Sequence, residues 1–169
     1  MWIGTNIGIE CYDPQSGTFI HQYRQNEAYS KINHPSVWCM TKDAQGNIWL
    51  GSYFGGINWF NPEHKVYSMY KATNKEGKGL SSPIVGCMVE DKDGNLYIAT
   101  EGGGLNHMDR NTGRIRWYNK KNSDLSSNNI QSLYYDQKKN ILWIGTHMGG
   151  LNSLNHKTIR INYNKGKFR

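Results

Sequence analysis

The sequence predicts an all-β fold assembled from a repeated four-stranded unit. The first indication is a phrase of four residues, aromatic, aliphatic, small and hydroxyl, that occurs four times. Its copies begin at Trp2, Trp49, Tyr97 and Trp143, so they are 47, 48 and 46 residues apart. The second is composition, because 19 glycines, four prolines and 12% aromatic residues suit short strands and tight turns. No stretch keeps a helical apolar period over three turns, and the regular spacing therefore indicates a repeat protein.

The second unit shows the order of its elements most clearly. Turns rich in Asp, Asn and Gly separate short apolar stretches, as in consecutive β-hairpins. Asp43 can cap the first turn through its side chain, and Gly46 suits a left-handed turn position. The paired glycines after the hydroxyl let the chain turn back close to a neighbouring unit. The predicted strands of this unit cover residues 37–41, 48–52, 57–60 and 66–70.

The third and fourth units repeat this order. Asp91 and Gly94 occupy the first turn of the third unit. The fourth unit has Lys139 near the glycine position and one extra residue before its aromatic, so we expect a wider hairpin there. The predicted strands cover 84–90, 96–100, 105–108 and 115–118, and then 130–135, 142–146, 151–154 and 159–163.

The first unit is incomplete. Met1 aligns with Ile48, Leu96 and Leu142, which lie in the second strands of their units, so the innermost strand is missing. Evenly spaced short strands with an aromatic–glycine signature are typical of propeller blades. We therefore expect a β-propeller fragment of about four blades with 15 strands, divided at 1–30, 31–78, 79–124 and 125–169 within one domain. Such a fan leaves apolar faces and strand edges in water, so we expect either a piece of a larger ring or two copies that close one ring. We favour the first, because natural repeats seldom begin inside a hairpin without a capping unit.

The longest form of the pattern covers residues 81–91 (SSPIVGCMVED) and 94–105 (GNLYIATEGGGL). It resembles the two-component regulator propeller repeat, and residues 34–57 and 126–151 match that repeat as well. The resemblance implies the periplasmic sensor region of hybrid two-component systems, which are common in gut Bacteroidetes. There, seven-bladed propellers precede a β-sandwich, a membrane span, a histidine kinase and a response regulator, and the sensor detects oligosaccharides as a homodimer. None of the downstream parts is present here, so no kinase chemistry is assigned to this chain.

The candidate ligand-binding residues lie in two sets of loops. In a four-stranded blade, the loops between the second and third strands share one face with the loops between blades. Aromatic rings there could stack on a pyranose while amides and carboxylates bond its hydroxyls, although the loops could also vary because nothing constrains them. The first set contributes Asn6, Tyr53, Phe54, Glu101, His147 and Met148, and the second contributes Asn33, His34, Ser82, Asn128 and Asn129.

Trp38 opens an innermost strand, where the equivalent residues are Gly86 and Gln131. Its ring could line the central channel as a ligand contact or fill space between blades, and we favour the second role. The aromatic residues that recur with the period, by contrast, are expected to pack one blade on the next.

Other functional classes receive little support. The net charge of +7 raises the possibility of nucleic-acid binding, but the basic residues gather on outer strands and in the tail, where they discourage edge pairing. Cys11, Cys39 and Cys87 form no metal motif and are expected to be free thiols. The six histidines show no zinc spacing. We predict no metal, no cofactor, no signal peptide and no membrane insertion by this segment.

Three functional hypotheses follow. The first is a non-catalytic segment of a glycan-sensing propeller. The second is a lyase similar to the streptogramin lyases, propellers that use a metal ion and histidine at the ring mouth, because His147 matches them loosely. The third is a structural platform that holds a dimer together. Glu101 has no evident carboxylate partner for glycoside hydrolysis, so the sequence predicts no enzyme.

Overall fold

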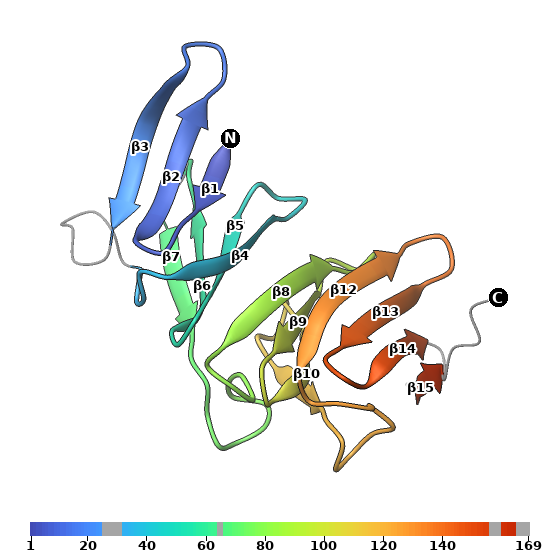
Figure 1. Ribbon diagram of the computed structural model, residues 1–169. Helices are drawn as coiled ribbons and strands as arrows, with labels where there is room; N and C mark the ends of the chain where they lie inside the picture. The colour runs from blue at the N-terminus through green and yellow to red at the C-terminus, as the bar shows by residue number, and fades with distance from the viewer. Residues whose placement is uncertain (25–31, 64–65, 156–159, 165–169) are drawn as a thin grey trace.

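The computed structural model describes residues 1–24, 32–63, 66–155 and 160–164. In this part of the chain the regular structure consists of fifteen strands in four antiparallel sheets. The sheets follow one another in chain order, and each is one blade of a propeller fragment (Figure 1). The fold class predicted from the sequence is confirmed.

The strands of each blade are consecutive in the chain. Blade 1 contains β1 (Trp2–Gly4), β2 (Gly8–Asp13) and β3 (Thr18–Arg24). Blade 2 contains β4 (Val37–Lys42), β5 (Ile48–Ser52), β6 (Gly56–Asn61) and β7 (Val66–Tyr70). Blade 3 contains β8 (Val85–Glu90), β9 (Leu96–Thr100), β10 (Gly104–Met108) and β11 (Ile115–Tyr118). Blade 4 contains β12 (Ile130–Asp136), β13 (Ile141–Thr146), β14 (Gly150–Asn155) and β15 (Arg160–Asn164).

The strands predicted from the sequence agree with these bounds to within one residue at most ends. The three-stranded blade 1 is also as predicted. The predicted division at residues 30 and 31 and the predicted strand start at Ile159 lie outside the described residues, as do His64 and His156. The limits of the four units stay predictions.

The innermost strands lie against one another from blade to blade, β4 beside β8 and β8 beside β12. The second strands β5 and β9 are buried along their whole length because each is covered by a neighbouring blade on both faces. The recurring aromatics pack forward onto the next blade. Trp2 meets Phe60 edge-on at a centroid distance of 5.4 Å, and Tyr97 lies 6.4 Å from Tyr135. The predicted packing role is confirmed for these two and for Trp49, which clusters with Val85 and Leu96 of the next blade. For Trp143 in blade 4 it stays a prediction.

The hairpin between the first two strands of a blade is held by its aspartate. Asp43 Oδ1 accepts hydrogen bonds from the backbone N–H of Gln45 at 3.0 Å and of Asn47 at 2.8 Å. Gly46 has a φ of 86°, the left-handed conformation expected for this turn.

In blade 4 the wider hairpin predicted from the sequence is wrong: pairing continues to Asp136 and Ile141, so four residues connect the strands where blade 2 has five. Asn140 has positive φ in this turn.

A buried asparagine in the third strand fixes the segment that leads into each blade. The side-chain oxygen of Asn106 accepts a bond from the Ser81 N–H at 2.8 Å, and its Nδ2 donates to Ser81 Oγ at 2.9 Å. Asn152 bonds Ser126 in the same two ways at 3.1 and 2.8 Å. We call this reciprocal pair the asparagine clamp. It recurs in blade 2, where Asn58 takes the place of Asn106 and its partner is Asn33.

Candidate functional site

The two sets of candidate loops lie together on one face. In three blades, the residue after the repeated hydroxyl donates its backbone N–H to the residue just before the innermost strand. Tyr53 bonds the Ser36 carbonyl at 3.1 Å, and Glu101 bonds the Ile84 carbonyl at 3.1 Å. His147 bonds the Asn129 carbonyl at 2.8 Å. The predicted shared face is therefore present, and we call it the loop face.

Four of the predicted residues form one cluster of rings on blade 2. Trp38 and Tyr53 are stacked, with centroids 4.6 Å apart and planes 26° apart. Phe54 meets Tyr53 edge-on at 4.4 Å, and the His34 ring lies 6.4 Å from Tyr53. These residues, His34, Trp38, Tyr53 and Phe54, are the aromatic cluster. They come from β4, the segment before it and the loop after β5, so neighbouring parts of one blade assemble the cluster.

The preferred prediction for Trp38, that it fills space between blades, is wrong. Half of its surface is exposed, and the indole lies against Tyr53 on the loop face. The equivalent residue of β8 is Gly86, so blade 3 presents no ring at this position. Phe54 is 55% exposed. Exposed rings stacked in this way present a flat apolar surface to solvent, which suits the apolar face of a sugar ring.

Blades 3 and 4 present different chemistry at the equivalent loop positions. Glu101 and His147 are exposed, as is Asn6 in blade 1. Met148 is 93% exposed and has a φ of 59°, a conformation that is costly for a residue other than glycine. Its counterpart in blade 3 is Gly102, so an apolar side chain is displayed in blade 4 where glycine would fit the backbone better.

The predicted amides mainly support the loops. Asn33 belongs to the clamp of blade 2, and its Nδ2 also donates to the Gly55 carbonyl. Asn128 Oδ1 accepts a bond from the Lys120 N–H at 2.9 Å, and Asn129 Oδ1 accepts one from the Gly102 N–H at 2.7 Å. Contacts of these amides with a ligand stay a prediction.

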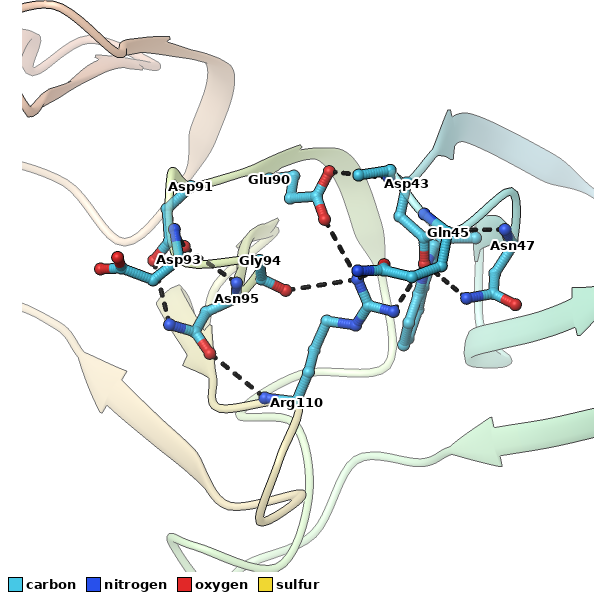
Figure 2. Close-up of polar contacts among 11 residues, drawn as sticks. Asp43, Gln45, Asn47, Glu90, Asp91, Asp93, Gly94, Asn95 and Arg110 are labelled. Carbon is cyan, nitrogen blue, oxygen red and sulfur yellow. Dashed lines mark hydrogen bonds and ion pairs between the residues drawn. The ribbon is translucent and has the colours of Figure 1, made fainter.

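The opposite face carries a polar network that sequence reasoning missed (Figure 2). Arg110 of blade 3 lies 2.7 Å from Asp43 Oδ2 in blade 2 and 3.1 Å from Glu90 Oε1 in its own blade. Its guanidinium also donates to Gln45 Oε1 at 2.9 Å and lies 5.2 Å from the centroid of the Trp49 ring. One residue thus joins two blades by charge, hydrogen bonds and a cation–π contact.

The carboxylates of this face are structural. Burial alone would raise the pKa of Asp43, but hydrogen bonds from Trp49 and Asn47 and the charge of Arg110 outweigh it and hold the pKa below its usual value. Burial would also raise the pKa of Asp91, but hydrogen bonds outweigh it and hold that pKa below its usual value. The largest of these contributions comes from His107. An acid held ionised in this way is poorly suited to proton transfer near neutral pH.

The cysteines are free, as predicted. Burial raises the pKa of Cys39 to about 12 and that of Cys87 to about 11, so neither is a thiolate at neutral pH. Within the described ranges no group of three or more His, Cys, Asp or Glu side chains is placed to hold a metal ion. The same ranges contain no helix that is long and apolar enough to cross a membrane.

The four sheets and the repeated loop face define a segment of a β-propeller. Comparison with known proteins shows which family of propeller repeats the chain resembles. Residues 31–54, 79–102 and 124–148 match the family model of the two component regulator propeller. The chain therefore carries three repeats of the two-component regulator propeller family, as its sequence pattern indicates. No curated protein matched it.

Several solved structures share the fold. The extracellular domain of the hybrid two-component system BT3049 from B. thetaiotaomicron aligns with a TM-score of 0.82 and 22% identity, over 96% of this chain and 23% of that one. The extracellular domain of BT4673, from the same organism, aligns at 0.79 and 20%, over 96% and 23%. Virginiamycin B lyase from Staphylococcus aureus aligns at 0.71 and 16%, over 99% and 52%. This chain spans less than a quarter of the length of each of these two extracellular domains.

Proposed function

We propose that this chain is a ligand-sensing segment of an extracytoplasmic propeller in a two-component regulator, and that its ligand is an oligosaccharide. The observation that carries the proposal is the aromatic cluster, whose stacked Trp38 and Tyr53 are exposed on the loop face. A pyranose would stack on these rings. The family repeats and the extracellular two-component proteins of the same fold support a periplasmic location and a sensory role.

The signalling step needs no chemistry in this segment. A ligand shifts a sensor between two arrangements only through its different affinity for each. The aromatic cluster of blade 2 offers the surface through which a ligand could act in this way. The remaining blades of the ring and a second sensor subunit would complete the sensing unit. Seven blades are expected for that ring.

Calorimetric titration of the sensor with a panel of oligosaccharides of neutral and acidic sugars tests the proposal. We expect Trp38→Ala and Tyr53→Ala to weaken binding by about tenfold or more, because each removes a stacking surface worth roughly 1.4 kcal/mol. Tyr134→Ala is the matched control, since Tyr134 is also exposed but lies toward the hairpin end of β12. Equal losses in all three variants, or unchanged affinity in the first two, would contradict the proposal.

Two other functions make different predictions. The shared fold with virginiamycin B lyase keeps a metal-dependent lyase open as the second candidate. Turnover that requires Mg²⁺ and disappears in His147→Ala would establish it in place of the sensor. A correctly folded sensor that gives no heat with any oligosaccharide would instead support a structural dimerisation platform.

A further inference from the structure

We propose that His34 selects the ligand of the aromatic cluster by donating a hydrogen bond from its Nε2 to one oxygen of the bound sugar. The recognised group is an acceptor at the edge of a pyranose, a hydroxyl or a uronic acid carboxylate, while the flat face of the sugar lies on Trp38 and Tyr53. This inference rests on the proposed function. It goes further because it names the atom that recognises the sugar and the chemical group that this atom recognises.

The segment before each of the innermost strands β4, β8 and β12 contains a side chain that accepts a hydrogen bond from the backbone N–H two residues later. In blades 3 and 4 this side chain is a serine, and the Oγ atoms of Ser82 and Ser127 accept at 3.4 and 3.2 Å. In blade 2 a histidine takes the position, and His34 Nδ1 accepts from the Ser36 N–H at 3.2 Å. The turn therefore requires an acceptor but does not require an imidazole.

The bond to Ser36 determines which nitrogen of the neutral imidazole carries the proton. A neutral imidazole has one acceptor nitrogen and one N–H donor. Since Nδ1 accepts from Ser36, the proton is on Nε2. A ring turned over in its plane would place a carbon against the Ser36 N–H, so the same bond also fixes the orientation of the ring. Nε2 is thus a donor with a defined direction.

This donor is available to a ligand. The His34 side chain is only partly buried, and Nε2 has no acceptor among the residues that the structure describes. The side chains of Asn33, Asn128 and Asn129 on the same face, by contrast, already bond the loops. Water satisfies a donor in such a position, and an oxygen of a ligand can replace that water at little cost.

The imidazole lies beside the stacking surface and does not extend it. The planes of Trp38 and Tyr53 are 26° apart, whereas the His34 ring meets Tyr53 at 63° with the centroids 6.4 Å apart. A pyranose that stacks on an aromatic ring turns its apolar face to the ring and carries its oxygens at its edge. A steeply inclined N–H donor at the border of the rings suits an oxygen in that position.

The donor and the stacking surface are held in place by the same turn. Tyr53 donates its N–H to the carbonyl of Ser36, the residue whose own N–H bonds His34. The loop after β5 also lies directly against the histidine, because a Cβ on Gly55 would be 2.7 Å from His34 Cβ. The position of the imidazole relative to Tyr53 is therefore set before a ligand arrives, which lowers the cost of binding.

The histidine occurs in the same blade as the exposed rings. At the loop position of Phe54, blade 3 has Gly102 and blade 4 has Met148. Both of those blades keep serine in the turn. Because serine already supplies the turn acceptor, the turn alone does not account for the histidine, and a contact with the ligand of blade 2 does.

The test titrates the 169-residue chain with three kinds of probe. The parent probe is methyl β-D-glucopyranoside, whose equatorial hydroxyls leave both faces of the ring apolar. The others are its monodeoxy derivatives and methyl β-D-glucuronide. NMR reports the affinities and the state of the His34 ring. We expect the proton of the neutral ring on Nε2, and we expect the Nε2 signal to shift when the sugar binds.

Two variants separate the donor from the turn. His34→Ser keeps the acceptor that blades 3 and 4 use, so it should fold with wild-type stability. It should bind the parent glucoside about three- to tenfold more weakly, the loss expected for one hydrogen bond between neutral groups. His34→Gln has the opposite design, because its amide N–H₂ reaches about as far as Nε2 while the turn acceptor is lost. It should bind the glucoside more tightly than His34→Ser does, although it is less stable.

The recognised oxygen is identified by combining the variant with the probes. One deoxy derivative should bind the wild type more weakly than the parent glucoside does, yet bind His34→Ser equally well, because the oxygen and its donor form a single bond. If the acceptor is a carboxylate, the glucuronide should bind the wild type more tightly than the glucoside and lose that advantage in His34→Ser.

The outcomes distinguish this proposal from the function on which it rests. Equal affinity of the wild type and His34→Ser for every probe, or a proton on Nδ1, would overturn the role of His34. The proposed function would stand in that case if Trp38→Ala still weakened binding. A wild-type chain that binds none of the probes would overturn both the role of His34 and the stacking surface.

Discussion

At the scale of single residues, two equivalent aspartates are kept charged by different partners. Asp43 Oδ2 accepts a hydrogen bond from Trp49 Nε1 at 2.7 Å. Blade 3 has a tyrosine in place of that tryptophan, and the third strand supplies the donor instead, with His107 Nε2 lying 3.3 Å from Asp91 Oδ2. The buried carboxylate is thus retained while its donor changes strand, because an unpaired buried charge would be costly.

Arg110→Met should lower the free energy of unfolding by about 3 kcal/mol. The substitution leaves Asp43, whose side chain is fully buried, without its opposite charge. Chemical denaturation of the variant and of the exposed control Arg114→Met measures the difference. A loss no larger than that of the control would mean that Arg110 contributes little to the joint between blades 2 and 3.

Met148→Gly should stabilise the protein by up to about 1 kcal/mol, because it relieves the positive φ of this residue. If Met148 belongs to the ligand surface, the same variant should bind oligosaccharide more weakly. Thermal unfolding and calorimetry on one preparation separate the two effects. A destabilised Met148→Gly protein would show that the added freedom of the unfolded chain outweighs the relief of backbone strain.

At the scale of elements, the asparagine clamp explains how a blade fixes the chain that enters it. The clamp residue lies on the third strand, and its partner lies 25 or 26 residues earlier, just before the first strand. Both bonds are local to one blade, so each blade positions its own part of the loop face. The aromatic cluster depends on this arrangement because His34 follows Asn33 directly.

Asn106→Ala should destabilise the chain by roughly 1–2 kcal/mol, since the part-buried N–H of Ser81 loses its acceptor and the Ser81 hydroxyl keeps only its contact with Thr100. The exposed Asn111→Ala is the control. Urea unfolding gives the two values, and hydrogen exchange at Ser81 reports whether the lead-in segment has loosened. Wild-type stability in Asn106→Ala would indicate that water replaces the clamp.

The strand order was predictable because it depends on local signals, such as the Asp-x-x-Gly turns and the recurring aromatic phrase. The exposure of Trp38 was not, since it depends on the stacking of its ring on Tyr53 from the loop after β5. Arg110 was also missed, because its partner Gln45 is 65 residues away and the equivalent position in blade 2 is Pro62. The loop positions that carry the aromatic cluster were found because they directly follow the repeated hydroxyl.

At the scale of the whole molecule, each blade packs only on its neighbours, so stability should vary along the chain. Blade 3 has a neighbour on both sides, and β9 is buried throughout. The amides of β9 and β10 should therefore exchange most slowly, about tenfold or more below those of β13 and β14 in terminal blade 4. Hydrogen exchange measured by NMR provides the comparison. Uniform exchange across blades 3 and 4 would show that the fragment unfolds as one unit.

The Arg110 network also determines which blades can stand next to each other. Arg110 meets an aspartate, a glutamine and a tryptophan on blade 2, together with a glutamate on its own blade. Blade 4 has Asp136, Lys138 and a four-residue turn where blade 2 has Asp43, Gln45 and a five-residue turn. A copy of blade 3 moved behind blade 4 would bring its arginine toward a lysine. Neighbouring repeats are therefore not interchangeable, because the contacts between blades require particular side chains on each neighbour.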